Sequence, residues 1–279
     1  QAIVSVYDSA TCFAYGHETI GSMEDLNAAT TADVKAFFDL YYAPNNAVLT
    51  VTGDFSPPEA KALIQQYFGD IPRGQTPPPV ECNQPFSTGE RRLRVPDAKA
   101  TLPAVAVLYR TPPAPSPDTP ALTLLASILG EGESSRLNVS LVRDSRAAVA
   151  VQALQLGDQR GPGALVALGI ANQGVSADSV EQLLRAQIAR IAAEGVTAEE
   201  LTKAKNLYRS TQIASRQSTM GVAEALQTAN MIYGDPEAVN TRFAPFMQVP
   251  IEDIRRVART YLQANNSVMV LIAPPEVTP

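Results

Sequence analysis

Tryptophan is absent from the 279 residues, and His17 is the only histidine. Zinc sites and catalytic triads that depend on imidazole usually need more than one histidine or a full set of other partners. The two cysteines, Cys12 and Cys82, are too far apart in sequence to be a closely spaced metal pair. They allow one disulfide without requiring it, and we expect two isolated thiols. The sequence therefore predicts neither catalytic residues nor a metal site within this chain.

Long apolar runs and blocks of one charge are also missing. No apolar run reaches 18 residues, so we expect no membrane span. The 28 acidic and 22 basic residues give a net charge of −6 without a cluster of Lys and Arg, which argues against a nucleic-acid partner. The chain is 45% hydrophobic, enough to fill the core of one large domain or of two ordinary ones.

A pattern near residue 45 returns near the C-terminal end at a shift of 220 positions, which carries Asn45 onto Asn265 and Val48 onto Val268. Each copy reads as an amphipathic helix, an Asn-Asn turn and an apolar strand. A repeat at this distance indicates two related domains in tandem. We expect the first domain to be truncated: if the second copy opens at Arg91, the first would open about 130 residues before Gln1.

The proline-rich stretch at residues 71–85 predicts a linker, because repeated proline favours extended, semi-rigid backbone. We therefore divide the chain into the C-terminal part of a first domain (residues 1–75), a linker (76–90) and a complete second domain (91–279). In the first part, helices at residues 31–42 and 59–68 have apolar faces that we expect to be buried, and residues 48–52 read as a strand.

The second part alternates strands and helices in an order typical of an α+β fold. Strands are predicted at residues 91–95, 104–109, 148–156, 165–170 and at the C-terminal end; helices are predicted at 118–129, up to 143, from 176, from 197, at 220–232 and from 251. This order favours tandem related domains, each with a largely antiparallel sheet and helices packed on one side.

Three features carry both an ordinary and a functional interpretation. The loop at residues 130–136 resembles a phosphate loop only in its glycines, so a plain turn between helices is favoured. His17 is interpreted as a loop or packing histidine rather than a ligand or a base. Arg143 ends a predicted helix, where it is either a solvated charge or a donor to a substrate carbonyl or carboxylate.

Several segments together resemble the insulinase/pitrilysin-type zinc metallopeptidases, including bacterial relatives of the mitochondrial processing peptidase. The likeness extends over the whole chain and is carried by the sequences at residues 15–21, 37–42, 44–47, 53–55, 67–72, 130–137, 141–143 and 201–205. The resemblance implies tandem α+β domains around a chamber that encloses an unfolded peptide, with an inverted His-x-x-Glu-His zinc motif on a helix of the active domain. In the second copy the matching helix is residues 122–129, which is apolar and holds neither histidine nor carboxylate.

The resemblance also gives Arg143 a role. Some members hold the substrate backbone with an arginine and a tyrosine seven residues later; Arg143 matches the arginine, but the tyrosine position is Ala150. Arg143 is therefore the one substrate-binding residue that we expect here, with no catalytic residue and no metal ligand.

These features lead to a hypothesis with alternatives. The chain reads as the C-terminal, non-catalytic portion of a zinc-dependent endopeptidase that helps enclose an unfolded peptide and is inactive by itself. Zinc is expected in the intact parent or in an active partner, and the partners would be a peptide substrate, an active peptidase domain or subunit, or a second copy of the chain. The bacterial periplasm or cell envelope is a plausible location. The alternatives are a non-catalytic scaffold subunit of a peptidase-like complex and a free-standing peptide-binding module.

Overall fold

The computed structural model describes residues 3–82, 89–157 and 161–274. Its centre is a five-stranded sheet in the order β1-β5-β2-β4-β3, in which β1 and β5 run parallel and every other neighbouring pair runs antiparallel. The strands are β1 (Arg91–Pro96), β2 (Ala104–Thr111), β3 (Ala148–Leu156), β4 (Gly163–Ala171) and β5 (Ser267–Ala273). The α+β fold expected from the sequence is confirmed.

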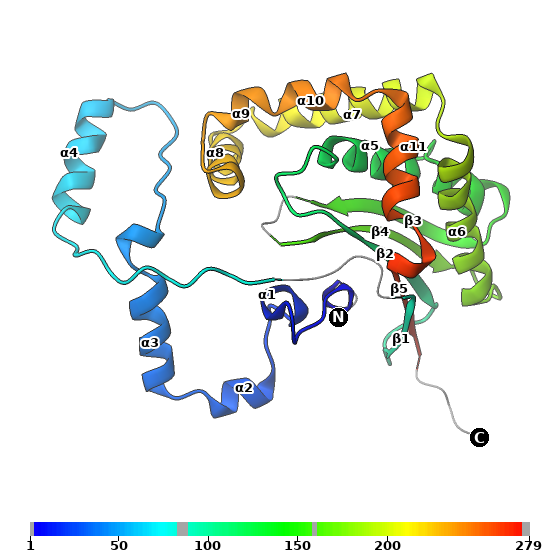
Figure 1. Ribbon diagram of the computed structural model, residues 1–279, viewed down its shortest axis with the longest axis horizontal. Coiled ribbons are helices and arrows are strands. Elements are labelled where there is room, and N and C mark those ends of the chain that lie inside the picture. The colour runs from blue at the N-terminus through cyan, green and yellow to red at the C-terminus, as the bar shows by residue number, and fades with distance from the viewer. Residues whose placement is uncertain (1–2, 83–88, 158–160, 275–279) are drawn as a thin grey trace.

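Helices cover one face of this sheet (Figure 1). They are α5 (Thr119–Gly130), α6 (Ala177–Glu194) and α11 (Ile251–Tyr261), and α7 (Ala198–Ser215) packs on α5. Leu125, Leu184 and Val257 bury against the sheet in one cluster with Val107 and Leu165. Burial of this many aliphatic side chains is the main source of stability for such a layer, at roughly 1.5–3 kcal/mol for each fully buried side chain.

The six helical segments predicted in this region are all present, and one of them is a π-helix rather than an α-helix. Helix α6 ends before Gly195, whose positive φ of 82° is one that glycine adopts without steric cost. Helix α7 opens with the predicted capping box, in which Thr197 and Glu200 bond reciprocally. The predicted helix that ends near Arg143 is instead a π-helix, η3 (Asn138–Asp144).

The remaining elements of this region extend the helical layer. They are α8 (Thr219–Tyr233), α9 (Ala238–Thr241), α10 (Phe243–Gln248) and the 3-10 turn η4 (Ala264–Asn266). The sequence reading missed α9 and α10, because each is one or two turns long and too short to show a helical period. Among the described residues, no helix has the length and apolar character needed to cross a membrane.

The first part of the chain is built of short helices and irregular segments. Its elements are η1 (Val4–Val6), α1 (Phe13–Gly16), α2 (Met23–Ala28), α3 (Thr31–Tyr41), η2 (Pro44–Asn46) and α4 (Pro57–Phe68). The predicted helices are present, and Thr30 caps α3 in a capping box. In Figure 1, α3 and α4 lie apart from the sheet and its helices.

The predicted burial of these two helices is wrong in this chain. The apolar side chains of α3 (Val34, Phe37, Phe38) and of α4 (Leu63, Tyr67, Phe68) are more than half exposed. Their spacing makes an apolar face on each helix, but within the described residues no sheet lies against either face. Amphipathic spacing reports which side of a helix can be buried, not whether a partner is present.

The internal repeat is visible in the local geometry. Helices α3 and α11 both have 11 residues, and each is followed by a 3-10 turn at the Asn-Asn pair. Asn46 Nδ2 donates to Tyr41 O at 2.9 Å, and Asn266 Nδ2 donates to Tyr261 O at 2.7 Å. The side-chain amide closes the same turn in both copies, which explains why this residue pair recurs.

The copies diverge immediately after the turn. In the second copy the chain continues as β5, which hydrogen-bonds to both β1 and β2. In the first copy residues 47–52 are not assigned to a strand, so the predicted strand at 48–52 is wrong as the structure stands. A strand requires neighbouring strands for its backbone hydrogen bonds, and the described residues place none beside this segment.

Candidate functional site

Arg143, the residue singled out for substrate binding, lies in the last turn of η3. Its side chain is 66% exposed, and its Nε donates to Asp144 Oδ1 at 3.3 Å. An exposed ion pair of this kind contributes at most about 1 kcal/mol. The guanidinium therefore remains able to bind a second acceptor. Short π-helical segments are rare and are often found at functional sites.

The chain that follows η3 is irregular at two further positions. Within the described residues, Arg146 is the only non-glycine residue with a positive φ, at 54°. Its carbonyl oxygen accepts a bond of 3.0 Å from Asn172 Nδ2, which fixes this backbone conformation. A β-bulge then interrupts the pairing of β3 with β4 between Ala148 and Ala150. Such irregularities redirect side chains and cluster near binding sites.

Strand β3 forms one edge of the sheet. It pairs with β4 on one side, and it is the last strand in the order, so its outer edge has no strand partner among the described residues. Val149 is 47% exposed, and Ala150 and Gln152 are exposed as well. The structure thus places Ala150, where the resemblance expects a tyrosine, on an accessible strand edge seven residues after Arg143, but without a ring or a hydroxyl group.

The far end of β3 borders a large cleft of about 1280 Å³. Gln155 and Leu156 line it from β3, and α8 lines the opposite side with Met220 and Met231. Two hydrogen bonds hold residues 47–52 beside α8: Gln227 Nε2 to Val48 O at 2.8 Å and Thr52 Oγ1 to Thr219 O at 2.9 Å. Strand β3 therefore runs from the two arginines at its start to this cleft at its end.

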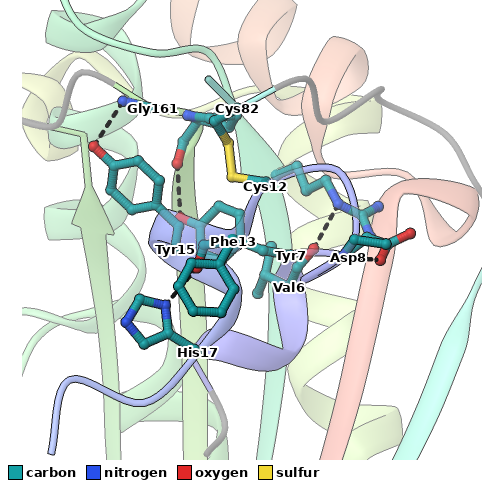
Figure 2. Close-up of a disulfide and its surroundings, with 12 residues drawn as sticks. Val6, Tyr7, Asp8, Cys12, Phe13, Tyr15, His17, Cys82 and Gly161 are labelled. Carbon is teal, nitrogen blue, oxygen red and sulfur yellow. Dashed lines mark hydrogen bonds between the residues drawn. A yellow bond between two sulfur atoms is a disulfide. The ribbon is translucent and has the colours of Figure 1, made fainter. Parts of the chain in front are cut away.

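The expectation of two isolated thiols is wrong, because Cys12 and Cys82 form a disulfide (Figure 2). Cys12 is completely buried against the face of the sheet opposite the helices, in a cluster with Val6, Leu108 and Val166. The two cysteines are 70 positions apart in sequence, so no local pattern indicated that they pair. Only the fold shows that Cys82 lies beside Cys12, at the start of helix α1.

Polar contacts reinforce the same attachment, which Figure 2 shows around the disulfide. Tyr7 donates from its hydroxyl to Pro162 O at 2.7 Å, and Tyr15 accepts at its hydroxyl from the backbone of Gly161 at 2.9 Å. The buried Arg110 of β2 donates from Nε to Val6 O at 2.8 Å. We call residues 3–17, with the disulfide, the N-terminal brace. Tyr15 also lines the cleft, so the brace supplies part of its wall.

The remaining candidates have structural roles. His17 is exposed, its ring stacks on Phe13 with a centroid distance of 4.3 Å, and Nδ1 pairs with the carbonyl oxygen of Phe13 (Figure 2). This arrangement agrees with a packing histidine. Among the described residues, no three His, Cys, Asp or Glu side chains gather to hold a metal ion.

The glycine-bearing loop at residues 130–136 is a packing junction. A Cβ on Gly130 would lie 2.0 Å from the backbone nitrogen of Ala153, so glycine allows α5 to contact β3. Arg136 binds Glu200 in a bidentate pair at 2.7 and 2.8 Å and also donates to Gly195 O. This guanidinium holds the pKa of Glu200 below its ordinary value, although partial burial opposes the shift.

Sequence reasoning missed Arg146, the disulfide and the edge position of β3. The order of strands in a sheet, and the left-handed φ of one arginine, are consequences of tertiary contacts that leave no local pattern in the sequence. A signal was present only for the disulfide, since the chain has two cysteines and no third.

Comparisons with known proteins identify the family to which the chain belongs. Residues 28–208 match the family model described as the Peptidase M16 inactive domain. The zinc protease PqqE of Helicobacter pylori is 29% identical over 268 residues, which cover 93% of this chain and 59% of that protein. The chain thus spans less than two thirds of the length of this relative.

Two solved structures place the fold. A protease from Helicobacter pylori superposes with a TM-score of 0.86 at 26% identity, covering 93% of this chain and 63% of that one. The periplasmic protease PqqL from Escherichia coli superposes with a TM-score of 0.63 over 80% of this chain and 24% of its own. At 17% identity, the second similarity shows the fold alone.

Proposed function

Because this chain belongs to the M16 peptidase family through its inactive domain, we propose that it is a non-catalytic portion of a zinc-dependent endopeptidase. In this role it would help to enclose and bind an unfolded peptide, and it would not cleave peptides by itself. The activity, the substrate and the zinc would belong to the longer protein or to a partner that carries the active domain.

The observation that carries this proposal is the character of α5. The resemblance matches this helix to the one that bears the zinc motif in an active domain. Here Leu122, Leu125 and Leu129 are completely buried in the core between α5 and the sheet, and α5 contains no histidine, cysteine or carboxylate. Zinc in proteins is held by such side chains at about 2.0–2.3 Å, so the residues present do not fit a zinc site.

The first part of the chain supports a second step of the proposal. We infer that residues 1–75 are the C-terminal part of a peptidase-like domain, that 76–90 link it to a second domain, and that the second domain extends over 91–279. The apolar faces of α3 and α4 are exposed, and residues 47–52, which correspond to β5 in the repeat, have no neighbouring strand among the described residues. An active peptidase domain, from the same protein or from a partner subunit, would cover these surfaces.

The same reasoning bears on location. Disulfides persist in oxidising compartments and are rare in the cytosol, and the solved relative PqqL is described as a periplasmic protease. Both support the bacterial periplasm or cell envelope as the site of action.

Binding without cleavage tests the proposal. We expect this chain to bind a fluorescein-labelled, unstructured peptide and to leave a quenched version of it intact over hours. Arg143→Gln should weaken binding about tenfold, because a charge-assisted hydrogen bond to the peptide is lost. Anisotropy titrations measure the affinity, and Arg73→Gln, which removes an exposed arginine from the first part of the chain, is the matched control. Absence of any peptide binding would contradict the proposal and favour a scaffold subunit.

A further inference from the structure

We propose that Arg143, Arg146 and the outer edge of β3 form one binding site for an extended peptide segment that carries an acidic side chain. This inference rests on the proposed function, since it names where the peptide lies and which chemistry it offers. It adds Arg146 as a residue that determines specificity.

The backbone of β3 provides the length of the site. An extended peptide can add to an exposed sheet edge, because the outer N–H and C=O groups of the last strand face no other strand. Nine residues at about 3.3 Å each span roughly 30 Å, enough for a segment of similar length. The strand leads from the two arginines to the cleft that Gln155 and Leu156 line, so the segment has a defined path.

The two arginines give the site its preference for acidic side chains. Arg143 and Arg146 are both exposed, and Asp144 is the one carboxylate between them in sequence. Asp144 contacts Arg143 at 3.3 Å, whereas Arg146 has no hydrogen-bond or ion-pair partner for its side chain among the described residues. A guanidinium binds a carboxylate through two parallel N–H donors, which selects acidic groups over neutral ones.

The overall charge of the chain cannot produce the same preference. The net charge is −6, so the average field repels an acidic peptide. A preference for acidic peptides would therefore report a local cationic site rather than general attraction.

The backbone geometry fixes this local site in place. Arg146 is held at its positive φ by the bond from Asn172 Nδ2 to its carbonyl oxygen, and the next carbonyl, of Ala147, accepts from the backbone nitrogen of Asn172 at 2.9 Å. The π-helix before Arg146 and the bulge at Val149 after it complete a run of three irregular features within residues 138–150. A rigid backbone loses less conformational entropy when a ligand binds to it.

The test uses three unstructured, fluorescein-labelled peptides that differ at one position, which is Glu, Gln or Lys. We expect the full chain to bind the Glu peptide about tenfold more tightly than the Gln peptide. Arg146→Asn should abolish most of this difference and leave the affinity for the Gln peptide unchanged. Asparagine tolerates a left-handed φ, so this variant keeps the backbone, and Arg146→Lys should retain part of the preference.

Two controls separate the contribution of the arginine charge from that of backbone pairing with the edge of β3. Arg259→Gln removes an exposed arginine from α11 and should change nothing. A Glu peptide with an N-methyl group on every residue of the segment has no backbone N–H left to pair with a strand edge, so it should bind at least tenfold more weakly. Thermal melting of each variant checks that it is folded.

The possible outcomes distinguish a failure of this inference from a failure of the proposed function on which it rests. If no peptide binds, the proposed function fails and this inference fails with it. If all three peptides bind equally, or if Arg146→Asn weakens the Glu and Gln peptides alike, the acidic site is wrong while peptide binding stands. If N-methylation has no effect, the edge of β3 is not where the peptide lies.

Discussion

Replacing Leu125 by alanine is expected to lower the free energy of unfolding by about 3 kcal/mol, because it leaves a cavity in a core that relaxes only partly. Leu125 has no exposed surface, and it lies on α5 in the cluster between the helices and the sheet. Urea unfolding followed by circular dichroism measures the change. The result matters for the proposed function, because the resemblance matches this helix to the one that would carry the zinc motif in an active domain.

Leu63→Ala is the matched control for this experiment. Leu63 lies on α4 and is 52% exposed. Its replacement by alanine removes the same side-chain atoms as Leu125→Ala. We expect a change of at most about 0.5 kcal/mol, as for other surface substitutions. Equal effects at the two leucines would contradict the assignment of α5 to the core and of the α4 face to the surface.

The second large effect is expected at the disulfide. Cys12→Ser should lower the stability of the oxidised protein by about 4 kcal/mol in the chain-entropy description, because the bond closes a loop across 70 residues. The loss should appear first at the N-terminal brace, where residues 3–17 become sensitive to proteases before the sheet does. Limited proteolysis with mass spectrometry and urea titration measure the two effects.

Reductant supplies the control for this prediction. Dithiothreitol should lower the stability of the wild-type chain to that of Cys12→Ser and should leave the variant unchanged, because only the wild type has a bond to lose. If reductant destabilises both proteins equally, or neither, the disulfide does not hold the brace.

Much of the sheet region could be predicted from its sequence, for a physical reason. Residues 104–109 and 165–170 are β-branched or aliphatic runs buried on both faces, and α6 shows a helical apolar period ended by glycine. In these segments the local pattern and the tertiary environment favour the same structure. The predicted α+β class, the principal helices of the sheet region and the repeat at the Asn-Asn turns therefore agree with the structure.

The first part of the chain shows where such a reading fails. Residues 48–52 have the composition of a strand, and α3 and α4 have apolar faces, yet strand formation and burial depend on neighbours that the local sequence does not contain. The candidate site could be predicted only in part, for a related reason. Arg143 was identified through a resemblance, whereas Arg146 became visible only when its φ and its place beside the edge of β3 were known.

The most direct test of the non-catalytic role is the zinc content and peptidase activity of this chain, measured beside a longer protein that continues it upstream. Plasma mass spectrometry would count the metal, and a quenched unstructured peptide would report cleavage. We expect this chain to carry no stoichiometric zinc and to leave the peptide intact, while the longer protein binds zinc and cleaves it. A longer protein that is also metal-free and inactive would favour the scaffold alternative, and zinc-dependent cleavage by this chain alone would contradict the non-catalytic role outright.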